Sequence, residues 1–321
     1  MTVRLGNVIP PTLEVSRIGL GLAALGRPGY ITLGHAADLA GETDVEAMRA
    51  HAHAVLDAAW QAGVRYFDAA RSYGLAEEFL GSWLAARGLG RADVTVGSKW
   101  GYTYTAGWRI DAEVNEVKDL SIETLRRQEG ESHVLLGDAL VLYQIHSATI
   151  ESGVLEDVAV LNELARLRAS GLRIGFTSTG PRQSETIECA VATGHFDAVQ
   201  ATFNLLDRSA GSALAAARGA GLGVIVKEAV ANGRLTGRGD VPELLAAAAQ
   251  LGVTADALAL AFVLAQPWVD VALSGASTVP MLLSNLAALD VPFDQEVDAR
   301  LAAVRESPGE YWERRAALPW N

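Results

Sequence analysis

Eight short apolar runs recur along this chain of 321 residues, and segments with helical periodicity lie between all of them. Parallel strands need a crossover connection, usually a helix, so strands that alternate with helices favour a parallel sheet. Eight such units over this length favour closure into a (β/α)8 barrel, the TIM barrel, as one domain over residues 1–321. We expect a short β-hairpin over residues 1–16 and extra helices at the C-terminal end. The expected strands are 18–22, 64–67, 94–99, 139–145, 172–176, 197–201, 223–226 and 269–273.

Three successive strands of this set end in a polar residue that can take part in proton chemistry: Asp68, Lys99 and His146. Tyr73 follows Asp68 on the loop before the next helix. Each residue alone has an ordinary structural explanation, but functional groups of a barrel gather at the carboxyl ends of its strands, so the recurrence favours a site. A tyrosine has a pKa of about 10, and a nearby ammonium lowers it. We therefore expect Lys99 to lower the pKa of Tyr73.

Residues 67–74 read Phe-Asp-Ala-Ala-Arg-Ser-Tyr-Gly and residues 77–81 read Glu-Glu-Phe-Leu-Gly. Together they closely resemble the signature of the aldo-keto reductase family, and the resemblance extends over about residues 18–289. It implies an oxidoreductase that moves a hydride between a nicotinamide cofactor and a small-molecule carbonyl or alcohol substrate.

The resemblance also implies a catalytic tetrad. Tyr73 would donate a proton to the carbonyl oxygen as general acid, and Lys99 would stabilise the phenolate. Asp68 would pair with Lys99 and hold it, while His146 would hydrogen-bond the carbonyl oxygen and orient it.

In the resembled family the nicotinamide end of the cofactor lies over the top of the barrel. Gly21 and Leu22 would lie beneath the ring, and Ser178 and Gln200 would hold its carboxamide. Lys227 stands where the family commonly has an aromatic residue that stacks on the nicotinamide, and a lysine cannot stack in that way.

For the phosphate end, the resemblance implies a loop over the pyrophosphate and a helix N-terminus. Arg234 of the loop could pair with phosphate oxygens. Thr278 suits an N-cap and Pro280 a first turn, and a helix N-terminus offers free N–H groups to a phosphate. The residues implied at this end are Asn232, Arg234, Leu235, Ser274, Gly275, Ser277, Thr278 and Asn285, the last as an adenine contact.

The resemblance leaves the choice between NADP(H) and NAD(H) open. The family often has Arg or Lys at the position of Ser277, to hold the 2′-phosphate of NADP(H). The resemblance makes NADP(H) the first choice, and NAD(H) is kept as the alternative because Ser277 carries no charge.

The substrate pocket has weaker signals. Residues 23–43 form a long irregular segment after the first strand, and long loops in compact domains are often functional. Tyr30 in this segment, and Trp100 and Tyr102 in the aromatic segment after the Lys99 strand, could line an apolar pocket. Local packing of these aromatic residues against the barrel rim is an equal alternative.

The composition of the chain disfavours some classes of binding partner. With 26 basic and 38 acidic side chains the net charge is −12, and no basic run is present, so we expect neither nucleic acid nor a membrane as a partner. The single cysteine, Cys189, excludes an internal disulfide and a cysteine zinc cluster, and no metal is expected. The chain has no signal-like segment, so we expect a cytoplasmic protein, either a monomer or a homodimer.

Three alternative functions stay open at this point. One is a cofactor-binding regulatory or partner subunit with little turnover, similar to the potassium-channel β subunits. Another is a lyase or epimerase that uses the cofactor transiently. An unrelated barrel hydrolase is disfavoured, because no second carboxylate partners Asp68 at another strand end.

Overall fold

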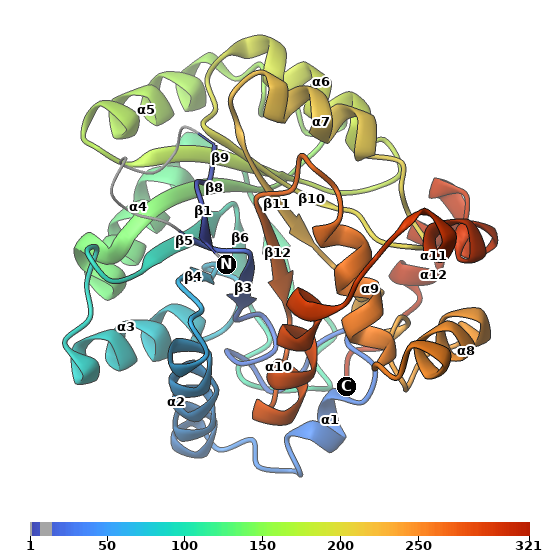
Figure 1. Cartoon of the computed structure of the whole chain (residues 1–321). Helices are drawn as coiled ribbons and strands as arrows, with labels where there is room; N and C mark the ends of the chain where they lie inside the picture. The colour runs from blue at the N-terminus through green and yellow to red at the C-terminus, as the bar shows by residue number, and fades with distance from the viewer. Residues whose placement is uncertain (1, 7–14) are drawn as a thin grey trace.

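The computed structural model describes residues 2–6 and 15–321. Within these residues eight parallel strands close into a barrel surrounded by helices (Figure 1). Each strand pairs with the next of the eight in the chain, and the last pairs with the first. The prediction of a (β/α)8 barrel is confirmed. The barrel strands are β3 (Ile18–Gly21), β4 (Tyr66–Asp68), β5 (Thr95–Trp100), β8 (Leu140–Ala148), β9 (Arg173–Ser178), β10 (Ala198–Thr202), β11 (Gly223–Lys227) and β12 (Val271–Ser274).

The helices bury one apolar face against the strands. In α2, for example, Met48, Ala52, Val55, Leu56 and Ala59 are buried at helical spacing, and the side chain of Asp44 caps the first turn. Helix α9 differs, because its residues from Ala255 to Val263 are all buried. The helices are α1 (His35–Asp38), α2 (Val45–Gln61), α3 (Ala76–Arg87), α4 (Ile122–Leu136), α5 (Val158–Ala169), α6 (Gln183–Thr193), α7 (Gly211–Gly219), α8 (Pro242–Leu251), α9 (Ala255–Leu264), α10 (Val279–Leu286), α11 (Gln295–Arg300) and α12 (Pro308–Ala316).

A two-stranded antiparallel sheet covers the amino end of the barrel. It pairs β1 (Thr2–Val3) with β2 (Val15–Ser16), and Leu5 and Val15 pack on Tyr66, Leu142 and other inward-facing barrel residues. The predicted hairpin is therefore present as a strand pair, while its Pro10-Pro11 portion lies outside the described residues. With this end closed by apolar packing, the opposite end of the barrel is left for a site.

Helix α5 begins at Val158, where Asp157 accepts hydrogen bonds from the first-turn N–H groups. Two segments differ from the sequence-based expectation. The aromatic segment after the Lys99 strand forms a hairpin of β6 (Tyr102–Tyr104) and β7 (Glu116–Lys118). The short helix α1 lies inside the long segment after β3.

The C-terminal segment returns to the carboxyl end of the barrel. Helix α12 starts with a capping box between Ser307 and Glu310. Beyond it, Asn321 exchanges backbone hydrogen bonds with Tyr30, so the chain end lies beside the segment that follows β3. Figure 1 shows the C-terminus near α1. The extra C-terminal helices thus reach the face of the barrel where a site is expected.

In the described part of the chain, no single helix is both long and apolar enough to cross a membrane. Helices α8 and α9 meet that test only as a pair, and they are bent by 90° at the break between them.

Candidate functional site

A cavity of about 670 Å³ opens at the carboxyl ends of the barrel strands. Its wall includes residues from several strand ends, from the segments after β3 and β11, and from the C-terminal tail. Lys99 lies behind this wall and is fully buried. The predicted site residues that line the cavity are Gly21, Tyr30, Asp68, Tyr73, Tyr102, His146, Gln200, Lys227, Asn232, Ser274, Gly275 and Asn285.

Both carboxylate oxygens of Asp68 accept hydrogen bonds. Lys99 Nζ donates to Asp68 Oδ1 and, at 2.8 Å, to the carbonyl of Ala69. The other oxygen, Oδ2, accepts from Gln200 Nε2 at 2.9 Å and from the Tyr66 hydroxyl at 3.2 Å. Strands β4 and β5 are neighbours, which brings the two charged side chains together. This buried, fully hydrogen-bonded pair fixes the position of the Lys99 ammonium.

Tyr73 lies directly above this pair. Lys99 Nζ is 4.8 Å from the centroid of the Tyr73 ring. Burial, and then the negative charge of Asp68, raise the pKa of Tyr73 well above its ordinary value. The expectation of a lowered pKa is wrong, because burial and the charge of Asp68 raise it. The phenol therefore holds its proton throughout the neutral pH range.

His146 faces Tyr73 across the cavity. Its ring packs edge-on against Tyr73 at 5.5 Å and against Tyr102 at 5.0 Å between centroids. Burial, together with the charges of Lys99 and Lys227, keeps the pKa of His146 well below its usual value, so the imidazole is neutral. The pairing of β8 with β9 shifts register between Ile145 and Ala148, which turns the strand end toward the cavity.

A buried arginine that the sequence reasoning missed holds one side of Tyr73. The guanidinium of Arg27 lies 5.2 Å from the Tyr73 ring centroid, 4.9 Å from that of Tyr30 and 4.6 Å from that of Trp320. Its Nη1 donates to Glu116 at 3.0 Å. Arg27 thus joins the segment after β3, the β6–β7 hairpin and the C-terminal tail around the tyrosine. A lone arginine in a Gly- and Pro-rich segment gives no sequence signal for such a role.

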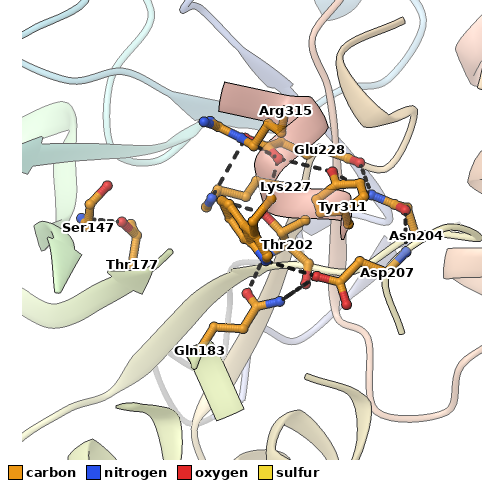
Figure 2. A network of polar contacts seen from close by, with 11 residues as sticks. Ser147, Thr177, Gln183, Thr202, Asn204, Asp207, Lys227, Glu228, Tyr311 and Arg315 are labelled. Atoms are coloured by element: carbon orange, nitrogen blue, oxygen red, sulfur yellow. Dashed lines mark hydrogen bonds and ion pairs between the residues drawn. The ribbon is translucent and has the colours of Figure 1, made fainter. Parts of the chain in front are cut away.

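On the β11 side of the cavity, a polar network links the barrel to α12 (Figure 2). Lys227 Nζ donates to the Thr202 hydroxyl at 3.0 Å. Glu228 accepts three hydrogen bonds from Arg315, at 2.9, 3.1 and 2.6 Å, and one from the Tyr311 hydroxyl at 3.2 Å. Burial would raise the pKa of Glu228, but Arg315 and Lys227 outweigh it and lower that pKa to about 2. These hydrogen bonds and ion pairs hold α12 over the cavity.

The other end of the cavity is built on β12 and α10. Ser274 Oγ donates to Asn285 Oδ1 at 2.7 Å, and Asn285 Nδ2 donates to Asp256 at 2.7 Å. The side chain of Thr278 accepts from the N–H of Met281, and a proline occupies the first turn, so the predicted cap and proline position are confirmed. Uncapped N–H groups and the positive end of the helix dipole favour a phosphate at this place.

One orphaned polar atom supports a fit to a nicotinamide dinucleotide. The hydroxyl of Ser178 is buried and has no hydrogen-bond partner among the described residues. A buried hydroxyl without a partner is costly, and a carboxamide would supply both a donor and an acceptor. Gln200 keeps its carbonyl oxygen for such a group, because only its amide nitrogen donates to Asp68. The residues present therefore fit the cofactor that the sequence implies.

Arg234 is not placed to contact a phosphate, contrary to the prediction from the sequence. Its guanidinium forms two hydrogen bonds to Glu306, at 3.0 and 2.7 Å, and one to Asp240 at 3.3 Å. The side chain is buried in these ion pairs and does not line the cavity. The expectation of a phosphate contact from Arg234 is wrong, because an acidic residue 72 positions later takes the guanidinium.

Arg238 is the arginine of this loop that lines the cavity. Both of its terminal nitrogens contact the carboxylate of Asp38, one of them at 2.9 Å. Ser277 lies behind the wall and donates its hydroxyl to the same carboxylate at 3.0 Å. Arg238, Asp38 and Ser277 therefore form one polar cluster at the end of the cavity near α10.

The remaining predicted residues divide between wall and core. Trp100 is fully buried among core residues and does not line the cavity, so its assignment to the substrate pocket is wrong. Leu22, Ser178, Leu235 and Thr278 are likewise absent from the cavity wall. Tyr30 and Tyr102 do line it. Among the residues that the structure describes, no group of three or more His, Cys, Asp or Glu side chains could hold a metal ion.

Comparisons with known proteins agree on one family. The sequence model described as "Aldo/keto reductase family" matches residues 17–306. An uncharacterised oxidoreductase of Bacillus subtilis (strain 168), YrpG, is 25% identical over 303 residues, 79% of this chain and 87% of that protein. The aldo-keto reductase str7 of Strobilurus tenacellus is 26% identical over 343 aligned positions, 95% of this chain and 94% of that protein.

The fold has a close relative among solved structures. The holo form of the aldo-keto reductase AKR11C1 from Bacillus halodurans superposes with a TM-score of 0.74 at 22% identity. The match covers 95% of this chain and 96% of that one.

Proposed function

Because this chain belongs to the aldo/keto reductase family, we propose that it is an NAD(P)H-dependent oxidoreductase that reduces an aldehyde or ketone to an alcohol, or catalyses the reverse oxidation. The observation that carries the proposal is the grouping of Tyr73, His146 and the Asp68–Lys99 pair around one end of a cavity. The other end of that cavity reaches the start of α10, where a phosphate would be stabilised.

The cofactor, when bound, supplies the hydride. Gln200 and Ser178 would hold its carboxamide, and the first turn of α10 would bind its phosphates. Ser274 and Asn285 line the same end and would contact its adenosine part. The cofactor end therefore has groups for each part of a dinucleotide.

Tyr73 acts as the general acid. As negative charge develops on the carbonyl oxygen of the substrate, the phenol donates its proton to that oxygen. The raised pKa keeps the phenol protonated until then. The Lys99 ammonium, held by Asp68, stabilises the phenolate that remains. In the reverse direction the same phenolate accepts the proton of an alcohol.

His146 orients the substrate. Its neutral imidazole carries one proton, and Ser72 Oγ lies 3.5 Å from Nδ1. In the tautomer that is protonated on Nε2, the ring donates a hydrogen bond to the carbonyl oxygen. The carbonyl oxygen then lies between two donors, Tyr73 and His146, which fixes its position for proton transfer.

The substrate side of the cavity favours a molecule with a planar or apolar part. Tyr30, Tyr102 and Trp320 line it, and aromatic walls bind such groups by burial and stacking. For the cofactor we propose NADP(H) first, with Arg238 as the residue that would pair with the 2′-phosphate. NAD(H) is the alternative, because Asp38 already occupies that guanidinium.

The proposal is tested by titrating the purified protein with NADPH and NADH, following tryptophan fluorescence. A screen of aldehydes and ketones then follows loss of the reduced cofactor. We expect saturable binding of at least one cofactor and turnover of at least one carbonyl compound. Binding without any turnover would favour the cofactor-binding partner subunit, and binding of neither cofactor would contradict the proposal.

A further inference from the structure

Lys227 lies between the two ends of the cavity. Going around the barrel from Ser274 on β12 to His146 on β8, the strands are β11, β10 and β9, and Lys227 ends β11. Its side chain is 17% exposed and lines the cavity. Lys227 lines the same cavity as Ser274 and His146, so its ammonium faces the space that a cofactor spanning both ends would occupy.

The positive charge of Lys227 is poorly compensated. Its one hydrogen-bond acceptor is the neutral Thr202 hydroxyl, among the described residues. The nearest carboxylate oxygen, of Glu228, is 3.9 Å away, and Arg315 takes that carboxylate by three shorter contacts. Figure 2 shows Arg315 above Glu228, and Lys227 below both of them, next to Thr202. An ammonium in this position repels a positive charge and attracts a negative charge on a ligand bound nearby.

We propose that Lys227 sets the redox preference of the cofactor site, so that the protein binds the reduced, neutral nicotinamide more tightly than the oxidised, positively charged one. This inference rests on the proposed function, since it needs a nicotinamide cofactor. It adds a role to a residue that neither donates the proton nor holds the carboxamide.

The physical reason is charge repulsion. The nicotinamide ring carries a full positive charge when oxidised and none when reduced, while the rest of the cofactor is unchanged. At an effective dielectric constant of about 20, two like charges a few ångströms apart repel by more than the energy of a tenfold change in affinity. We therefore expect Lys227 to weaken binding of the oxidised form by about tenfold and to leave the reduced form nearly unaffected.

The protonation state of Lys227 offers a second way to observe this. Burial lowers the pKa of Lys227 to about 8, against the opposing charge of Glu228. The other charged groups that face it are Arg315 from α12 and the Lys99–Asp68 pair on β5 and β4. Because Lys227 loses its charge as the pH rises through about 8, the affinity for the oxidised cofactor should rise over that range.

The test is a pair of binding titrations, which need no turnover. Dissociation constants for the oxidised and reduced forms of whichever cofactor binds are measured by tryptophan fluorescence at neutral pH. In the wild-type protein the reduced form should bind at least about tenfold more tightly. In Lys227→Met, which keeps the length and removes the charge, this ratio should fall by about tenfold, through tighter binding of the oxidised form.

The charge-preserving variant Lys227→Arg serves as the matched control and should keep most of the wild-type ratio. Circular dichroism confirms that each variant is folded, and the pH dependence of the ratio in the unmodified protein does not depend on any variant. An unchanged ratio in Lys227→Met, or equal weakening of both forms, would overturn the inference. If the wild-type protein binds neither form, the proposed function itself fails and this inference fails with it.

Discussion

Replacing Glu228 by glutamine should destabilise the protein by about 3 kcal/mol at neutral pH. Burial would raise the pKa of this carboxyl, but Arg315 and Lys227 lower it from 4.5 to about 2. The difference of between two and three pKa units corresponds to about 3 kcal/mol, since each tenfold change in proton affinity is worth roughly 1.4 kcal/mol. Glutamine keeps the volume and can still accept hydrogen bonds, but it leaves Arg315 without its counter-charge.

The loss of stability in Glu228→Gln should depend on pH in a defined direction. The folded-state pKa lies below the unfolded value, so the stabilisation is complete above pH about 5 and declines as the pH falls from 4.5 toward 2. The difference between the wild-type protein and Glu228→Gln should therefore fall from about 3 kcal/mol at pH 7 to about 1 kcal/mol at pH 3. Other carboxylates titrate in both proteins and cancel in this difference.

Urea denaturation, followed by tryptophan fluorescence at both pH values, measures the two differences. Glu313→Gln is the matched control, because Glu313 is an exposed carboxylate on α12, the helix that carries Arg315. It should change the free energy of unfolding by no more than about 0.5 kcal/mol. A Glu228→Gln protein as stable as the wild type at pH 7, or a difference that is equal at both pH values, would refute the reasoning.

Three further predictions concern the cavity. Arg238→Gln should weaken NADPH binding about tenfold and NADH binding less than twofold. Asp38→Asn should strengthen NADPH binding, because it frees the guanidinium of Arg238. Equal effects on both cofactors in binding titrations would contradict this prediction. Lys99→Met should lower kcat at least about 100-fold with little change in cofactor affinity, since it removes the charge that stabilises the phenolate; a loss confined to binding would count against that role. Because burial and Lys99 hold the pKa of His146 well below its usual value, kcat/KM should not fall between pH 7.5 and about 6; an acid limb near pH 6.5 that disappears in His146→Gln would show the opposite.

The sequence was informative where a residue's place follows from local periodicity. The ends of three apolar runs placed Asp68, Lys99 and His146 at one end of the barrel, because parallel strands present their carboxyl ends together. Trp100 was misplaced because β5 continues one residue further than expected. Side chains alternate along a strand, so if Lys99 points inward then Trp100 must point outward to the helices.

The pairing of charged side chains on loops could not be predicted. Arg234 and Arg238 lie four positions apart on one loop, yet Glu306 takes the first and Asp38 the second. Both partners are distant in the sequence and arrive through tertiary packing. The same holds for Arg315, whose capture of Glu228 leaves Lys227 with little compensation.

Several expectations stay predictions. They are the single domain over residues 1–321, the cytoplasmic location, and the choice between monomer and homodimer. The preference for NADP(H) over NAD(H) also stays a prediction, because the arginine nearest the relevant end of the cavity is held by Asp38. These properties depend on surfaces and partners that local sequence patterns do not encode.

The role of Tyr73 as proton donor is tested most directly by Tyr73→Phe, which removes one hydroxyl and keeps the ring that packs against Arg27 and His146. The measurement is kcat for a carbonyl substrate found in the screen, together with the dissociation constant of the reduced cofactor. We predict that kcat falls at least about 100-fold, within the range expected for loss of a general acid, while the cofactor still binds within about threefold of wild type. Wild-type turnover in Tyr73→Phe would contradict the account.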